Sequence, residues 1–126
     1  MKWVSQNAVL AIHRRQIAEH GGKSGVRDLN LLQSALARPQ NILAYEEDSD
    51  ITRLAAAYAF GITRNHPFID GNKRVAYVVM RTFLLLNGFD LNASQEEKYL
   101  MFIELAAGKV EEIELAEWIR GSLRNM

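Results

Sequence analysis

The residues best suited to chemistry lie in one segment of nine, residues 66–74, with the sequence HPFIDGNKR. Lys73 and Arg74 fall in the first turn of a predicted helix, where cations oppose the positive end of the helix dipole by about a few tenths of a kcal/mol each. Two cations at such a position indicate a negatively charged ligand. Free main-chain N–H groups at a helix start, beside a glycine (Gly71) that lets a ligand approach the backbone, are typical of a phosphate site.

His66 and Asp70 could supply the chemistry at this phosphate site. A neutral imidazole can take a proton from a hydroxyl at neutral pH. Asp70 offers a hard oxygen ligand, and magnesium is commonly held by one or two carboxylates together with phosphate oxygens and water. Taken singly, Asp70 could be a helix N-cap, His66 a buried histidine, and the cations a solvated helix start. Their occurrence together in a fixed order favours phosphate-group transfer.

The segment resembles the signature of the Fic/Doc family, His-x-Phe-x-(Asp/Glu)-(Ala/Gly)-Asn-(Lys/Gly)-Arg, at every defining position. Residues 21–22, 25–28 and 44–47 also look like segments of death-on-curing (Doc) toxins, so the resemblance covers nearly the whole chain. Lys73 is typical of the Doc branch, the toxins of type II toxin–antitoxin systems, whereas the Fic branch usually has glycine there and transfers AMP. Gly71, by contrast, is shared with the Fic branch, so this position favours the Doc branch less than Lys73 does.

The resemblance implies a protein kinase that transfers a phosphoryl group from ATP to a threonine of elongation factor Tu and so inhibits translation. His66 would be the general base on the target hydroxyl, and Asp70 would be the Mg²⁺ ligand. The phosphate-binding groups would be Gly71, Asn72, Lys73 and Arg74. Two alternatives stay open: Fic-type AMP transfer (AMPylation) to a protein hydroxyl, and a non-catalytic helical interaction module that keeps the loop only as an anion or antitoxin site.

The resemblance also implies a cognate, Phd-like antitoxin. The AMP transferases of the family often carry an inhibitory helix with the pattern Ser/Thr-x-x-x-Glu-(Gly/Asn), and no such string occurs in these 126 residues. Control of a toxic activity is therefore expected from another chain. In Doc-type systems this is a small antitoxin whose C-terminal segment folds into a groove of the toxin.

The composition limits the class of protein. A chain of 126 residues with 48% hydrophobic residues is typical of one globular domain, residues 1–126. The absence of cysteine excludes a disulfide scaffold and a cysteine nucleophile and agrees with a cytoplasmic location. The longest apolar run, Leu54–Ile62, is too short to span a membrane, and a net charge of zero disfavours direct binding of duplex DNA. His13 and His20 lack the paired spacing of metal ligands and are assigned no role.

Helices must position the segment, because strand signals are nearly absent. Apolar periodicity and capping signals predict six helices, which begin near Ser5, after Asp28, after Asp50, at Gly71, after Ser94 and near Glu112. The second is expected to end before Pro39, which leaves residues 38–50 as a candidate flap. The fourth, Gly71–Leu86, is apolar nearly all round and is expected at the centre. The predicted fold class is all-α, a compact, Fic/Doc-like bundle of about six helices around a central apolar helix.

Overall fold

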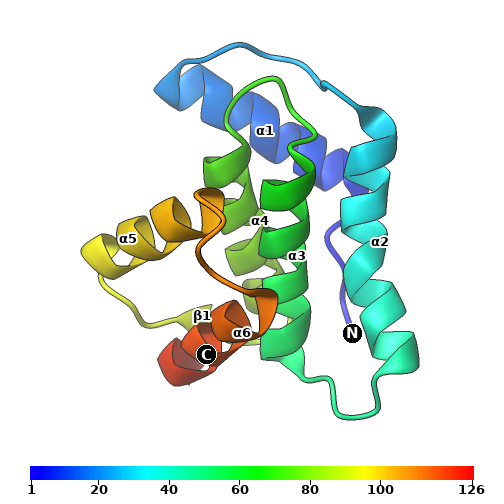
Figure 1. Cartoon of the computed structure of the whole chain (residues 1–126), viewed down its shortest axis with the longest axis vertical. Coiled ribbons are helices and arrows are strands. Elements are labelled where there is room, and N and C mark those ends of the chain that lie inside the picture. Colours follow the sequence, from blue (N-terminus) through cyan, green and yellow to red (C-terminus); the bar gives the residue numbers. More distant parts are fainter.

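The computed structural model describes all 126 residues and contains six helices and two short strands (Figure 1). In chain order they are α1 (Gln6–His20), α2 (Leu29–Tyr45), α3 (Ile51–Asn65), α4 (Asn72–Leu86), β1 (Phe89–Leu91), α5 (Gln95–Ala106), α6 (Glu112–Ser122) and β2 (Leu123–Asn125). The all-α fold class is confirmed. None of the helices combines the length and the hydropathy that crossing a bilayer requires.

The central helix of the bundle is α3, which packs against α2, α4, α5 and α6 (Figure 1). The prediction of a central apolar helix is confirmed, but the prediction that α4 fills this place is wrong. The reason is the small size of the side chains along α3, where four alanines are fully buried. Gly61 lets α2 come closest, since a Cβ at that position would lie 3.4 Å from the backbone of Ala35. Small residues thus allow α3 to contact more helices than the bulkier α4.

The prediction that the second helix ends before Pro39 is wrong, because α2 continues through this residue to Tyr45. A proline inside a helix removes one hydrogen bond and costs about 3 kcal/mol. Here Pro39 is buried, and Ile42 extends the same apolar stripe into the core, so packing against α3 outweighs that cost. Most of residues 38–50 is therefore helix, and the candidate flap is reduced to the short connection 46–50.

A two-stranded antiparallel sheet closes the C-terminus, with Leu91 opposite Leu123. The sequence predicted neither strand. Between the strands and α4, the Asp90 carboxylate forms ion pairs with Arg81 at 2.9 Å and with Arg124 at 3.6 Å. Because these pairs link α4, β1 and β2, the short strands are tied to the bundle rather than standing alone.

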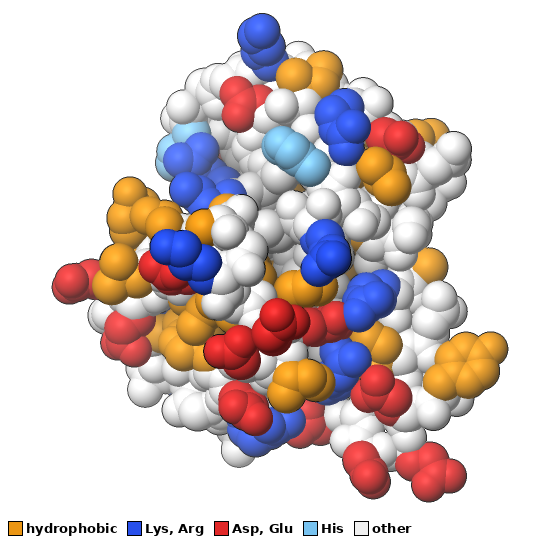
Figure 2. Space-filling view, viewed as in Figure 1, with side chains coloured by type: hydrophobic (Ala, Val, Ile, Leu, Met, Phe, Trp, Pro, Cys, Tyr) orange, Lys and Arg blue, Asp and Glu red, His pale blue; other side chains and the backbone are white.

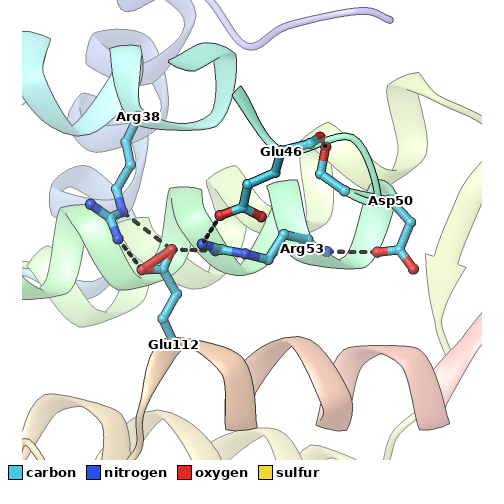
Figure 3. A network of polar contacts seen from close by, with 6 residues as sticks. Arg38, Glu46, Asp50, Arg53 and Glu112 are labelled. Atoms are coloured by element: carbon cyan, nitrogen blue, oxygen red, sulfur yellow. Dashed lines mark hydrogen bonds and ion pairs between the residues drawn. The ribbon is translucent and has the colours of Figure 1, made fainter. Parts of the chain in front are cut away.

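An ion-pair network joins α2, α3 and α6 near the start of α3 (Figure 3). Glu112 of α6 accepts hydrogen bonds from Arg38 of α2 and from Arg53 of α3, the latter at 2.6 Å, and Arg53 also pairs with Glu46 at 3.1 Å. Burial alone would raise the pKa of Glu112, but the hydrogen bonds from the two arginines outweigh it, and the pKa lies below its usual value. The network fixes the end of α3 opposite to the one that carries residues 66–74.

Candidate active site

Residues 66–74, here called the α3–α4 loop, leave the core where α3 ends. His66 caps α3 in the left-handed conformation (φ 51°, ψ 54°), and no other non-glycine residue has a positive φ. Such a conformation is strained and persists only where the surroundings hold it. Arg27 supplies this hold, because its guanidinium donates to the carbonyls of His66 at 2.7 Å and of Asn65 at 2.9 Å. The chain therefore reverses at His66 and leaves its side chain exposed.

The segment between α1 and α2 lines the other side of the α3–α4 loop. The N–H groups of Arg27 and Asp28 donate to Pro67 O, and Ile69 N–H donates to Gly25 O. Val26 and Phe68 form an isolated antiparallel β-bridge. This pairing explains why residues 25–28 accompany the signature in sequence: they are its structural neighbours.

The side chain of Asn72 braces the loop from within. Its Oδ1 accepts from Phe68 N–H and its Nδ2 donates to Phe68 O, both at 2.9 Å. The remaining Nδ2 hydrogen points at Nδ1 of His66, 2.6 Å away. Asn72 is only 7% exposed. Its side chain is thus fully used inside the loop, and what it has left for a phosphate is its main-chain N–H.

This geometry sets the hydrogen-bonding state of the His66 ring. The Asn72 amide cannot be turned over without facing Phe68 with the wrong groups, so Nδ2 must be the atom that meets the ring. Nδ1 of His66 is therefore an acceptor, and a neutral ring carries its hydrogen on Nε2. In this arrangement the ring presents an N–H donor to the cavity.

His13 of α1 supports the loop from beneath, a role that the sequence did not suggest. Its ring stacks on Phe68 with centroids 4.0 Å apart, and its Nε2 lies 3.0 Å from Asp70 O. Because a carbonyl only accepts, Nε2 must carry a hydrogen. His13 is 3% exposed and 57 positions away from Asp70, so no local pattern could have revealed the contact.

All the predicted site residues line one cavity of about 370 Å³ at the start of α4: Thr63, His66, Asp70, Gly71, Asn72, Lys73, Arg74 and Ala106. Thr63 and Ala106 were not predicted. In Figure 2 a histidine and several basic side chains lie around the upper end of the molecule, where Figure 1 places the loop, while most acidic side chains lie lower. The six predicted residues are thus brought together.

The cavity has the properties of an anion site. Gly71 precedes α4 in the left-handed conformation (φ 80°), and the first helical bond is donated by Val75 to Gly71 O. The N–H groups of residues 72–74 therefore lack partners within the helix. Lys73 and Arg74 are exposed and form no ion pair, although Lys73 Nζ lies 5.9 Å from the ring centroid of Tyr99. Free donors, the helix dipole and two unpaired cations all favour a phosphate here.

Asp70 could provide one carboxylate ligand for a magnesium ion whose other ligands are phosphate oxygens and water. Its Oδ1 accepts from Gly71 N–H at 2.9 Å and its Oδ2 from Lys23 N–H at 3.2 Å, which leaves further lone pairs on an exposed carboxylate. The chain has no group of three or more His, Cys, Asp or Glu side chains that could hold a metal by themselves. One carboxylate with phosphate oxygens and water is a common magnesium environment.

Comparison with known proteins identifies the family of this chain. The model of the Fic/DOC family matches residues 3–84. The protein kinase doc of Escherichia phage P1 is 31% identical over 120 residues, which cover 95% of this chain and 94% of the kinase. Toxin Doc of Mycolicibacterium smegmatis is 42% identical over 74 residues, or 58% of this chain and 57% of that toxin. With its resemblance to Doc-type toxins confirmed over nearly its full length, the chain belongs to the Fic/DOC family.

Proposed function

We propose that this chain is the toxin of a type II toxin–antitoxin system and a protein kinase that moves the terminal phosphoryl group of ATP to a protein hydroxyl. The observation that carries this proposal is the single cavity in which His66, Asp70 and the two free cations surround the start of α4. The names of the two relatives, a protein kinase and a toxin, support the same activity. The proposed target is a threonine of elongation factor Tu in the cytoplasm, and the proposed regulator is a Phd-like antitoxin.

The phosphates of the nucleotide would rest on the N–H groups at the start of α4, with Lys73 and Arg74 balancing their charge. Asp70 would hold Mg²⁺, which when bound offsets charge on the phosphate oxygens. The hydroxyl oxygen of the target then bonds to the terminal phosphorus, the bond from that phosphorus to the bridging oxygen breaks, and ADP leaves. The hydroxyl proton passes to His66. Positioning and electrostatic stabilisation supply most of the catalysis in phosphoryl transfer, and these groups would provide both.

The role of His66 as base requires a change from the geometry described above. Its outward nitrogen must be free of hydrogen, whereas the contact with Asn72 places the acceptor nitrogen on the inner side. A half-turn of the exposed ring about Cβ–Cγ frees Nδ1 from Asn72 and directs it outward. We propose that the arriving hydroxyl, which offers Nδ1 a new donor, drives this turn.

Radioactive ATP separates the proposed reaction from its rival. Purified elongation factor Tu is incubated with this chain, Mg²⁺ and ATP labelled at either the γ- or the α-phosphate. Kinase activity transfers only the γ-label, whereas AMP transfer transfers only the α-label. AMP transfer is the second candidate because Gly71 is shared with the Fic branch. The His66→Ala variant is the control and is expected to transfer neither.

Expression in bacteria tests the non-catalytic alternative. A toxic enzyme loses growth arrest when His66 is replaced by alanine, with its fold retained, and co-expressed antitoxin restores growth to cells with the wild-type chain. An interaction module would still arrest growth with the His66→Ala variant. For the binding roles, Asp70→Ala should weaken ATP binding only in the presence of Mg²⁺, and Arg74→Ala should weaken it with or without Mg²⁺. Equal affinities in all three proteins would contradict these assignments.

A further inference from the structure

Two consecutive glycines follow α1, and only the first is needed to end the helix. Gly21 is the C-cap of α1 and donates its N–H to Ile17 O. Glycine is common directly after a helix. A Cβ at Gly21 would meet no atom within 4 Å. The second glycine, Gly22, also has a positive φ, of 112°, and the end of the helix does not account for it.

The carboxylate of Asp70 lies against Gly22, and this contact accounts for the second glycine. A Cβ at position 22 would lie 2.7 Å from Asp70 Oδ2 and 3.2 Å from Asp70 Cγ, and the first distance is shorter than a Cβ atom can approach. Lys23 donates its main-chain N–H to the same Oδ2 at 3.2 Å. In Figure 1 this part of the chain passes beside the green loop between α3 and α4. Gly22 thus leaves the space that the carboxylate needs to reach Lys23 N–H.

One face of α1 contacts the α3–α4 loop on both sides of Asp70. The His13 ring lies nearly parallel to the Phe68 ring, with an angle of 7° between their planes, and its Nε2 donates to Asp70 O. Ile17 lies one turn further along α1, and its Cδ1 would be 3.4 Å from a Cβ at Gly71. The main chain of Asp70 is therefore held by the same helix whose end receives its carboxylate.

The donors that hold the Asp70 carboxylate are both main-chain N–H groups, those of Gly71 and Lys23. An exposed aspartate would otherwise sample several staggered rotamers. A lysine or arginine partner would fix the rotamer but would also offset the negative charge that attracts a cation. Main-chain donors fix the rotamer and leave the charge in place, and carboxylates that bind metals are typically hydrogen-bonded by such outer groups.

We propose that His13 and Gly22 are positioning residues for Asp70. His13 fixes the main chain of Asp70, and Gly22 opens the space in which Lys23 N–H fixes the carboxylate. The assignment rests on the proposed function, in which Asp70 holds Mg²⁺. It adds that α1, which supplies no side chain to the cavity, controls how strongly the cavity binds Mg²⁺.

Calorimetric titration with ATP, with and without Mg²⁺, tests the proposal. The measured quantity is the factor by which Mg²⁺ raises the affinity for ATP. Gly22→Ala displaces the carboxylate from Lys23 N–H, and His13→Phe keeps a stacked ring but removes the donor. Each should lose most of this factor, as Asp70→Ala does, and should bind ATP like the wild type without Mg²⁺. His13→Gln restores a side-chain N–H donor and should recover part of the factor.

Two matched controls separate positioning from general damage, provided that circular dichroism shows all variants to be folded. Gly21→Ala places a Cβ at a neighbouring positive φ but in open space, and His20→Phe alters an exposed histidine of the same helix. Both should keep the factor of the wild type. If His13→Phe and Gly22→Ala weaken ATP binding equally with and without Mg²⁺, their role is only structural. If Gly21→Ala loses as much of the factor as Gly22→Ala, strain in the turn is the cause. Either result overturns the proposal.

Proton–nitrogen NMR of the metal-free protein gives a second readout. The amide proton of Gly71 is bonded to Asp70 Oδ1, so it should move upfield in Gly22→Ala and His13→Phe but not in the controls. If it stays in place in all variants, Asp70 is held without these residues and the proposal is overturned. If Mg²⁺ does not raise the affinity of the wild type for ATP, the metal role of Asp70 in the proposed function fails, and the positioning role fails with it.

Discussion

Replacing Asn72 by alanine should destabilise the α3–α4 loop and the protein with it. The substitution leaves the main-chain N–H and C=O of Phe68 without a hydrogen-bond partner, because Asn72 is the only partner of both groups. Phe68 has no exposed surface, so water does not replace the lost bonds directly. A buried polar group without a hydrogen-bond partner lowers the free energy of unfolding by about 1–3 kcal/mol. Two such groups, in a loop that can shift enough to admit some water, predict a loss of about 2–4 kcal/mol in the free energy of unfolding.

Urea unfolding followed by far-ultraviolet circular dichroism measures this loss. Asn41→Ala is the matched control, because Asn41 is an exposed helical asparagine that makes no side-chain hydrogen bond, and its replacement should change the free energy of unfolding by less than about 0.5 kcal/mol. If the two variants differed in stability by less than about 1 kcal/mol, the internal bracing by Asn72 would be refuted. The His66 ring would then owe its position to other contacts.

Three further outcomes follow from the ion pairs. Glu112→Ala leaves Arg53, whose side chain is only 14% exposed, without its main partner and should reduce the free energy of unfolding by about 2–4 kcal/mol in urea titrations. Arg120→Ala breaks an exposed pair with Asp50 and a hydrogen bond to Thr52 Oγ1, which keeps Asp50 as its partner, so it should reduce the free energy of unfolding by less than about 1 kcal/mol. Equal losses in the two variants would contradict the network's burial. Hydrogen bonds from Arg81 hold the pKa of Asp90 below its usual value, so its contribution to stability is complete above about pH 4 and is lost as the pH falls further. In thermal unfolding, wild type and Asp90→Asn should therefore converge in acid, and a constant difference from pH 7 to about pH 2 would count against this pairing.

The site could be predicted from sequence because its residues are contiguous. A phosphate loop at a helix start needs a glycine, free N–H groups and nearby charges, and residues 70–74 place all of these within about one helical turn. The contacts that hold the loop could not be predicted in this way. His13 lies 57 positions from the carbonyl that it contacts, and Arg27 lies 39 positions from His66. Only the tertiary fold brings these groups together.

The helix boundaries lie where the local capping signals predict them, except where tertiary packing outweighs those signals. The N-caps at Asp28 and Asp50 and the capping box at Ser94 mark the helix starts as predicted. Pro39 is a strong local signal for a helix end, yet burial of the following turn against α3 keeps α2 intact. The two strands escaped prediction because three residues are too few to show a period-two pattern, and each strand forms only by pairing with the other.

Intact-protein mass spectrometry of a bacterial translation extract, incubated with ATP, Mg²⁺ and this chain, tests the central claim most directly. The account predicts that elongation factor Tu gains the mass of one phosphoryl group with the wild-type chain and gains nothing with His66→Ala. A gain of the mass of AMP would contradict the kinase assignment and establish the rival transfer. The absence of any His66-dependent change in mass would contradict catalysis by this loop altogether.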